Sequence, residues 1–152
     1  MKTIGIRVSP KTVTFAIFDD SNREIVNVEE LKVPAALSWP ESLTYVRYNL
    51  LDIMRVYEVS RAGIRETEPT AKSPNSKRLQ LEAVIQEAFA SARIEKFRVV
   101  QIASLGSLLQ IPRDQVKPMI QGNTSPEFAS NWSEWSLEQR EAILTAMGVA
   151  NA

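Results

Sequence analysis

The side chains that could do chemistry in this chain are few, because the sequence contains no cysteine and no histidine. The chain alone therefore cannot supply a thiol nucleophile, a thiolate or imidazole metal ligand, or a Ser-His catalytic pair. The chemistry that remains is that of carboxylates, lysine, tyrosine, serine and threonine, with magnesium or manganese as the metals that oxygen ligands can hold.

Three glutamates are the candidates for a carboxylate site. Glu66 follows a predicted strand at 61–65, and Glu138 and Glu141 lie three residues apart on one face of a predicted helix. Together they could hold magnesium or manganese in a nuclease-like site. We favour the structural alternative, in which Glu138 stabilises the first turn of its helix through the macrodipole and Glu141 is an ordinary solvated residue.

Basic residues gather in the segment 55–78, which has six lysines and arginines against three acids, whereas the segment 121–152 has one arginine against four acids. The basic segment could contact phosphate groups, because its loop and the following helix N-terminus add backbone donors. A normally solvated loop is the alternative that we favour, since no aromatic residues alternate with the basic ones. The candidate phosphate or nucleic-acid contacts are Arg7, Arg65, Lys72, Lys77 and Arg78.

Two tryptophans, Trp132 and Trp135, stand in an otherwise polar stretch. Paired tryptophans of this kind can anchor an interface with a protein partner, which makes these two residues the candidates for such an interface. They can also attach a loop to the core beside a capped helix, and we favour this second interpretation.

The first third of the chain predicts strands. Apolar residues alternate with other residues over 4–8 and 13–17, with a turn at 10–11 between them. Turn-forming residues at 19–22 precede a third run at 24–33, so we expect a three-stranded antiparallel meander.

Helices and strands then alternate. Capping boxes open the first and last helices, Asn75 or Ser76 caps the second, and Gly148 is expected to end the last. Because helices connect the later strands, the fourth and fifth strands should run parallel to the first. The predicted segments are helices at 39–57, 76–92, 113–119 and 137–147 and strands at 61–65 and 97–102.

Length and composition favour a single domain over residues 1–152, since 44% of the residues are hydrophobic and the chain is too short for two ordinary domains. The formal net charge is zero, from 18 basic and 18 acidic residues, so no overall field draws the protein onto nucleic acid or a membrane. No apolar run reaches the length of a spanning helix, and charge interrupts the first residues, so we expect a cytoplasmic protein.

The order of the elements, β-β-β-α-β-α-β followed by a C-terminal helix, and several short motifs resemble the RNase H-like superfamily in its Holliday-junction-resolvase (RuvC-like) branch. The resemblance implies an α/β fold with a five-stranded mixed sheet flanked by helices. It spans nearly the whole chain, and the order of the motifs matters more than any one of them. The segments that carry it are 4–6, 15–17, 62–65, 71–76, 112–116 and 138–142.

Two positions depart from the pattern of that family. Arg7 stands where the resemblance implies the aspartate of the first strand, and Arg65 where it implies the glutamate of the fourth. RNase H-like nucleases hold two divalent ions on carboxylates, whereas arginine cannot ligate a cation and stays protonated. We therefore expect no catalytic residue and no metal here, and salt bridges from the two arginines to Glu66, Glu138 or Glu141, or a bound anion.

These observations favour a catalytically degenerate RNase H-like domain, a pseudo-nuclease that acts as a binding or accessory protein in a DNA-processing or mobile-element system. The alternative is a metal-dependent, resolvase-like nuclease in which Glu66, Glu138 and Glu141 are displaced ligands for magnesium or manganese. The partner is a protein or a nucleic acid, and the sequence leaves that choice open. Resolvase-like relatives commonly act as dimers, so a homodimer is a further hypothesis.

Overall fold

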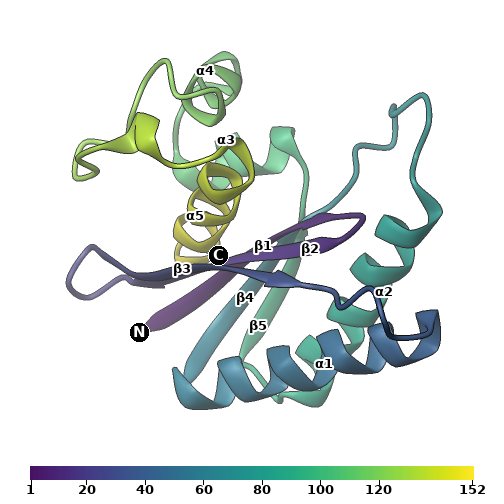
Figure 1. The fold of residues 1–152 in the computed structure, drawn as a ribbon. Helices are drawn as coiled ribbons and strands as arrows, with labels where there is room; N and C mark the ends of the chain where they lie inside the picture. The colour runs from purple at the N-terminus through teal and green to yellow at the C-terminus, as the bar shows by residue number, and fades with distance from the viewer.

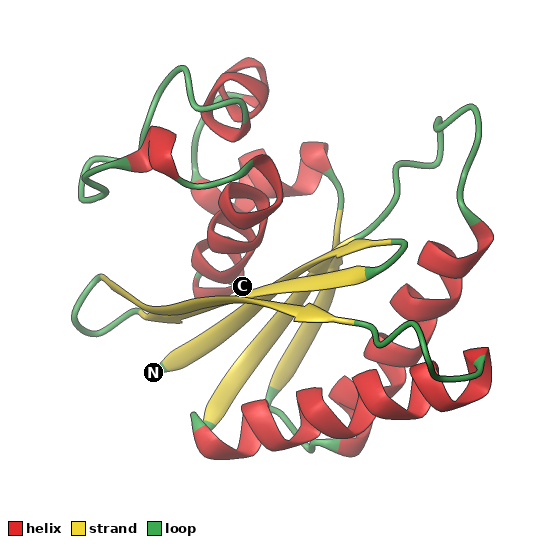
Figure 2. Ribbon diagram, in the orientation of Figure 1, coloured by secondary structure: helices red, strands yellow, loops and turns green.

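The structure, a computed structural model, describes all 152 residues as one five-stranded sheet with helices on both faces (Figure 1, Figure 2). None of the helices has the length and apolar character needed to cross a membrane. The elements are β1 (Lys2–Ser9), β2 (Thr12–Asp19), β3 (Glu24–Lys32), α1 (Trp39–Val56), β4 (Val59–Arg65), α2 (Ser76–Ser91), β5 (Lys96–Val100), α3 (Ile102–Leu109), α4 (Val116–Ile120) and α5 (Leu137–Ala150), with short 3-10 turns at Arg113–Gln115 and Trp132–Glu134.

The strands lie in the order β3-β2-β1-β4-β5, which confirms the predicted mixed sheet. β1, β2 and β3 form an antiparallel meander through two tight turns, whereas β4 and β5 run parallel to β1. The parallel pairs follow from the helical crossovers that precede β4 and β5. The central pair, β1 and β4, places Gly5 opposite Gly63 and Arg7 opposite Arg65.

Two helices, α1 and α2, cover one face of the sheet. The expected capping box is present at the start of α1, where the Ser38 side chain accepts from the Glu41 N–H and the Glu41 carboxylate accepts from the Ser38 N–H. Asn75 caps α2 by accepting from the Arg78 N–H. The two helices bury the aliphatic and aromatic side chains of this face of β1, β2 and β4 in the larger of two hydrophobic clusters.

The opposite face is covered by α5, which lies very close to β1 (Figure 1). A Cβ atom on Gly5 would come within 2.1 Å of the Ala142 carbonyl oxygen, so this glycine is required by the close approach of the helix backbone. Gly63, its neighbour on β4, faces Val149 and Thr145 of the same helix. Because neither glycine has a side chain, α5 packs closely against the centre of the sheet.

Some predicted boundaries were wrong in the C-terminal third. Gly148 does not end α5, because it packs against Leu105 and Leu108 inside a helix that continues to Ala150. The fifth strand ends at Val100 instead of Ile102, where the unpredicted helix α3 begins. The short helix expected at 113–119 is present as the 3-10 turn and α4.

Candidate functional site

The arginines that replace the expected carboxylates lie side by side near the carboxyl ends of the two central strands. Arg7 is near the end of β1, Arg65 is the last residue of β4, and the two are register partners. Glu141, in the second turn of α5, reaches both of them from the helix seated on the glycines. The sheet order and the close helix together determine this arrangement.

One carboxylate oxygen of Glu141 is shared by the two guanidinium groups. Its Oε2 atom lies 3.2 Å from Nε of Arg7 and 3.3 Å from Nε of Arg65. The side chains are 5% exposed for Glu141, 3% for Arg65 and 14% for Arg7. The predicted salt bridge from the arginine pair to Glu141 is thus confirmed, and the expectation that Glu141 is an ordinary solvated residue is wrong, because α5 packs too closely on the sheet.

The remaining guanidinium N–H groups donate to the loop that follows β4. Nη2 of Arg65 lies 3.0 Å from the Glu68 carboxylate, and its Nη1 donates to the Glu66 carbonyl at 2.5 Å. Nη1 of Arg7 donates to the carbonyls of Arg65 and Glu66 at 2.8 and 3.2 Å. Glu66 therefore contributes its backbone, and Glu68, which the sequence analysis did not single out for this role, contributes the second carboxylate.

Burial controls the ionisation of this cluster. Removal from water lowers the pKa of Arg7 to about 10, an effect that the charge of Glu141 partly offsets. Burial likewise raises the pKa of Glu141 above its ordinary value, against the opposing effect of Arg7 and Arg65. Nε of Arg65 and Oε2 of Glu141 are buried without a well-aligned hydrogen bond, so the contact between them is an ion pair alone. The side chains of such a cluster stay in place, because moving one away would leave a buried charge without its partner, at a large cost in free energy.

A third arginine beside the cluster is paired in the same way. Nε of Arg78, in the first turn of α2, lies 3.2 Å from Oε2 of Glu82 one turn later. Glu82 is buried and also accepts from the backbone N–H and the hydroxyl of Thr67, at 3.2 and 2.9 Å from the same oxygen. Arg78 is therefore held by an acid of its own helix.

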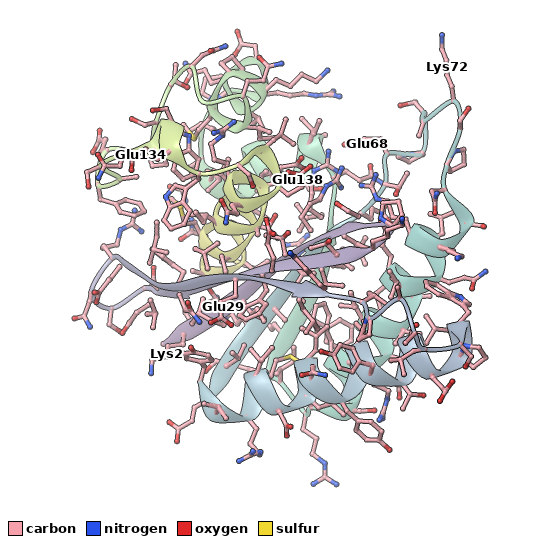
Figure 3. All side chains as sticks on the ribbon, viewed as in Figure 1. Lys2, Glu29, Glu68, Lys72, Glu134 and Glu138 are labelled. Carbon is pink, nitrogen blue, oxygen red and sulfur yellow. The ribbon has the colours of Figure 1, made fainter.

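The five predicted phosphate contacts fall into two groups. Arg7, Arg65 and Arg78 are paired with glutamates inside the chain. Lys72 and Lys77 are exposed, Lys72 on the loop between β4 and α2 (Figure 3) and Lys77 with its ammonium 5.1 Å from the centre of the Trp39 ring. Contact of any of the five with phosphate stays a prediction.

The three glutamates proposed as displaced metal ligands do not converge. The Glu66 carboxylate accepts from Nε2 of Gln101 at 2.7 Å, Glu138 forms no ion pair, and Glu141 faces two arginines. The structure contains no group of three or more acidic side chains that could hold a metal ion. The residues at this site therefore do not fit the pair of divalent ions that the RNase H-like resemblance implies.

A pocket that the sequence did not indicate opens next to Arg65. It has a volume of about 480 Å³ and lies between the loop after β4, which contributes Glu68 and Thr70, and the segment formed by the 3-10 turn and α4, which contributes Arg113, Asp114 and Lys117. These two cations lie four residues apart and have no ion-pair partner in the chain. The i, i+4 spacing was the available signal, but a single such pair is common on helices.

The two tryptophans have different environments. Trp132 is buried in the second hydrophobic cluster, and its indole N–H donates to the Met119 carbonyl at 2.8 Å. Trp135 is partly exposed at the edge of the same cluster and lines a surface pocket. Trp132 thus attaches its loop to the core, while Trp135 keeps part of its ring at the surface.

Solved structures with a similar fold are Holliday junction resolvases. RuvC of Thermus thermophilus matches with a TM-score of 0.71 at 12% sequence identity, covering 99% of this chain and 94% of its own. RuvC of the same organism in complex with a Holliday junction substrate matches over the same shares at 12% identity with a TM-score of 0.70. The yeast mitochondrial resolvase Ydc2 matches at 14% identity and a TM-score of 0.57, covering 98% of this chain and 77% of its own.

No protein-family model matches the sequence, and no curated protein matches it either. The likeness is therefore one of architecture: the same five strands, in the same kind of mixed sheet, with helices on both faces. It agrees with the resemblance drawn from the sequence motifs. This chain has the RNase H-like fold in its RuvC-like form.

Proposed function

We propose that this chain is a non-catalytic RuvC-like domain that binds its target and does not cut it. The observation that carries the proposal is the shared Glu141 oxygen, 3.2 and 3.3 Å from the two arginines. In a metal-dependent nuclease this part of the fold must hold cations on carboxylates. Here the cations are part of the protein, and the acid that faces them is already neutralised.

Electrostatics argue against a divalent ion at this position. Two unit positive charges about 4 Å apart repel by about 4 kcal/mol at an effective dielectric constant of about 20, and a divalent ion would feel about twice that from each guanidinium. Glu141 and Glu68 offset the arginines, so they are not free to offset a metal as well. The displaced-ligand nuclease remains the alternative proposal.

Branched DNA is the target that we propose first. The support is the fold, which is shared with a resolvase described in complex with a Holliday junction substrate, and a set of cations without an ion pair around the pocket next to Arg65, which we call the cleft. Arg113 and Lys117 face a pocket, and Lys72 is exposed on the opposite loop. Such residues can contact phosphates on either side of the cleft without using Arg7 or Arg65.

Self-association is part of the same proposal, since it would present two copies of the cleft to a branched substrate. The edge strand β5 has a free side and carries two exposed apolar residues, Phe97 and Val99, which are 48% and 38% exposed. An unpaired edge of this kind is a natural site for pairing with a second chain. We expect a concentration-dependent dimer in analytical ultracentrifugation, and lysines at both positions should shift it toward monomer.

The decisive experiment compares binding with cleavage on one substrate. A labelled four-way junction is incubated with the protein in magnesium and in manganese, and both the bound fraction and the products are measured over a range of salt concentrations. We expect salt-sensitive binding without products. Cleavage that disappears in Glu66→Gln, Glu138→Gln or Glu141→Gln variants would overturn the proposal in favour of the nuclease.

A further inference from the structure

A second pocket lies at the opposite end of β2 from the arginine cluster. It has a volume of about 520 Å³ and is formed by the turn between β2 and β3 and by the segment that precedes α5. Its walls include Glu24 from the start of β3 and Phe128, Glu134 and Trp135 from the segment. The two pockets share no lining residue, and Figure 3 shows Glu134 of this pocket apart from Glu68 of the first.

Arg23 is itself a lining residue of the pocket, and its guanidinium group lies against Phe128 of the pocket wall and the buried Phe18. The Phe18 and Phe128 ring centres lie 5.8 Å apart, and the guanidinium carbon of Arg23 is 5.7 Å from the first and 5.5 Å from the second. These distances lie within the range of cation–π attraction. Arg23 is also 3.7 Å from Asp20, so its charge is balanced at the rim of the pocket.

The rest of the pocket has an excess of negative charge. The carboxylates of Glu24 and Glu134 line it, and neither takes part in an ion pair or hydrogen bond within the chain. The only cation of the segment 121–152 is Arg140, which is buried and donates to the carbonyls of Ile120 and Trp135. The pocket thus has two unbalanced carboxylates beside an aromatic wall, which would repel the phosphates of a nucleic acid.

Trp135 adds a polar group that the chain does not use. The indole N–H of Trp132 is satisfied by the Met119 carbonyl, whereas the indole N–H of Trp135 has no acceptor in the protein. A tryptophan at an interface commonly keeps such a donor for its partner. The two neighbouring tryptophans are therefore divided between an internal role and a surface role.

We propose that this pocket binds an arginine or lysine side chain of a protein partner. Because Arg23 already lies over Phe128, the cation would lie against Trp135 with its charge offset by Glu24 and Glu134, and a backbone carbonyl of the partner would accept from the Trp135 N–H. The site goes beyond the proposed DNA binding, because its charge is opposite to what a phosphate requires. It makes the domain a connector between a nucleic acid at the cleft and a basic protein segment at this pocket.

The test uses three capped tripeptides, Gly-Arg-Gly, Gly-Lys-Gly and Gly-citrulline-Gly, titrated into the full chain and followed through the three tryptophan indole resonances. Citrulline keeps the shape of arginine without its charge. We expect the arginine and lysine peptides to shift the Trp135 resonance, with Trp132 and Trp39 unchanged, and citrulline to have no effect. Equal shifts with citrulline, or no shift with either basic peptide, would overturn the proposal.

Matched variants test the charge. The double variant Glu24→Gln, Glu134→Gln should lower the affinity for the basic peptides about tenfold, since two carboxylates beside the bound cation are removed. Glu30→Gln, an exposed glutamate farther along β3, makes the same kind of charge change away from the pocket and should leave binding unchanged. Equal effects of the control and the paired variant would contradict a local site, as would a Trp135 shift produced by a DNA oligonucleotide in place of the peptides. Unchanged Trp132 resonances confirm that each variant is folded.

Discussion

Two pairs of cations lie at the same edge of the sheet and differ in what surrounds them. Arg7 and Arg65 are buried at the strand ends and share the carboxylate of Glu141. Arg113 and Lys117 line an open pocket together with Glu68 and Asp114 and form no ion pair with either acid. Equal charges therefore have different surroundings: the first pair is held by acids of the chain, and the second forms no ion pair within it.

The comparison shows that the sign of a residue's charge does not identify its role in binding. A buried cation that is matched by an acid has already exchanged water for a protein partner, so a ligand gains little by approaching it. An exposed cation attracts phosphate but contributes little to stability. Substitutions in the two pairs should accordingly separate stability from affinity.

The largest effect on stability is expected where α5 packs against Gly5. Gly5→Ala would place a methyl group within 2.1 Å of the Ala142 carbonyl, and backbone atoms cannot move aside as side chains can. We expect a loss of more than about 3 kcal/mol in the free energy of unfolding, measured in urea, because overpacking displaces the helix that carries Glu141. Gly106→Ala, which meets a side chain first and at 3.2 Å, should change stability by less than about 1 kcal/mol.

Removal of the shared acid comes next. Glu141→Gln would leave Arg7 and Arg65 with neutral surroundings at that oxygen, and an uncompensated buried charge costs about 3 kcal/mol. Urea unfolding at neutral pH measures the loss. Glu138→Gln, one turn earlier on α5, should cost less than about 1 kcal/mol, since only a macrodipole interaction is removed. Similar losses in both variants would show that Glu141 is not the counterion.

The pH dependence of stability should reveal the same coupling. Arg7→Met with Arg65→Met removes two of the three arginine charges that lower the pKa of Glu141 and leaves that of Arg78, so burial should raise that pKa further above 4.5. A carboxyl whose pKa is higher in the folded state than in the unfolded state loses stability as the pH rises between the two values, by about 1.4 kcal/mol for each pH unit that separates them. The free energy of unfolding of the variant, relative to that of the wild type, should fall from about pH 4.5 upward. It should rise again in acid. A flat difference across this range would contradict the coupling.

Substitution of Arg113 and Lys117 should give the smallest change in stability and the clearest change in binding. Arg113→Ala with Lys117→Ala should lower affinity for a four-way junction and reduce the slope of log affinity against log salt by about 1.8, or about 0.9 for each lost phosphate contact. Fluorescence anisotropy over a salt series measures both. The slope of the Arg7→Met, Arg65→Met protein should match that of the wild type, and a reduced slope there would place phosphates in the buried cluster after all.

The first strands and the first capping box could be predicted because they depend on local patterns: alternation in β1 and β2, and Ser38 with Glu41 at the start of α1. The pairing of β1 with β4 is not local, and its prediction depended on the family resemblance. Helix α3 has no such pattern, because its N-cap residue, Gln101, is not a usual capping residue and Gly106 lies in its interior. Gly148 has the position of a helix end in the sequence, and only the packing of Leu105 and Leu108 shows that a small residue is needed there.

The site divides in the same way. That Arg7 and Arg65 would be neighbours follows from strand order, but the choice of Glu141 and Glu68 over Glu138 depends on how closely α5 sits on the sheet. The open pocket and the aromatic pocket bring together segments far apart in the sequence, so no spacing rule could indicate them.

The sharing of one Glu141 oxygen by two arginines also constrains how this protein can change over generations. An acid in place of either arginine would put a second carboxylate beside Glu141 with one arginine left near both, and loss of Glu141 would leave Arg7 without an acidic partner and Arg65 with Glu68 alone. Every single-residue step from this cluster toward a carboxylate site therefore passes through a less stable protein. Selection for a folded chain disfavours an acid at either arginine position, whatever the domain binds.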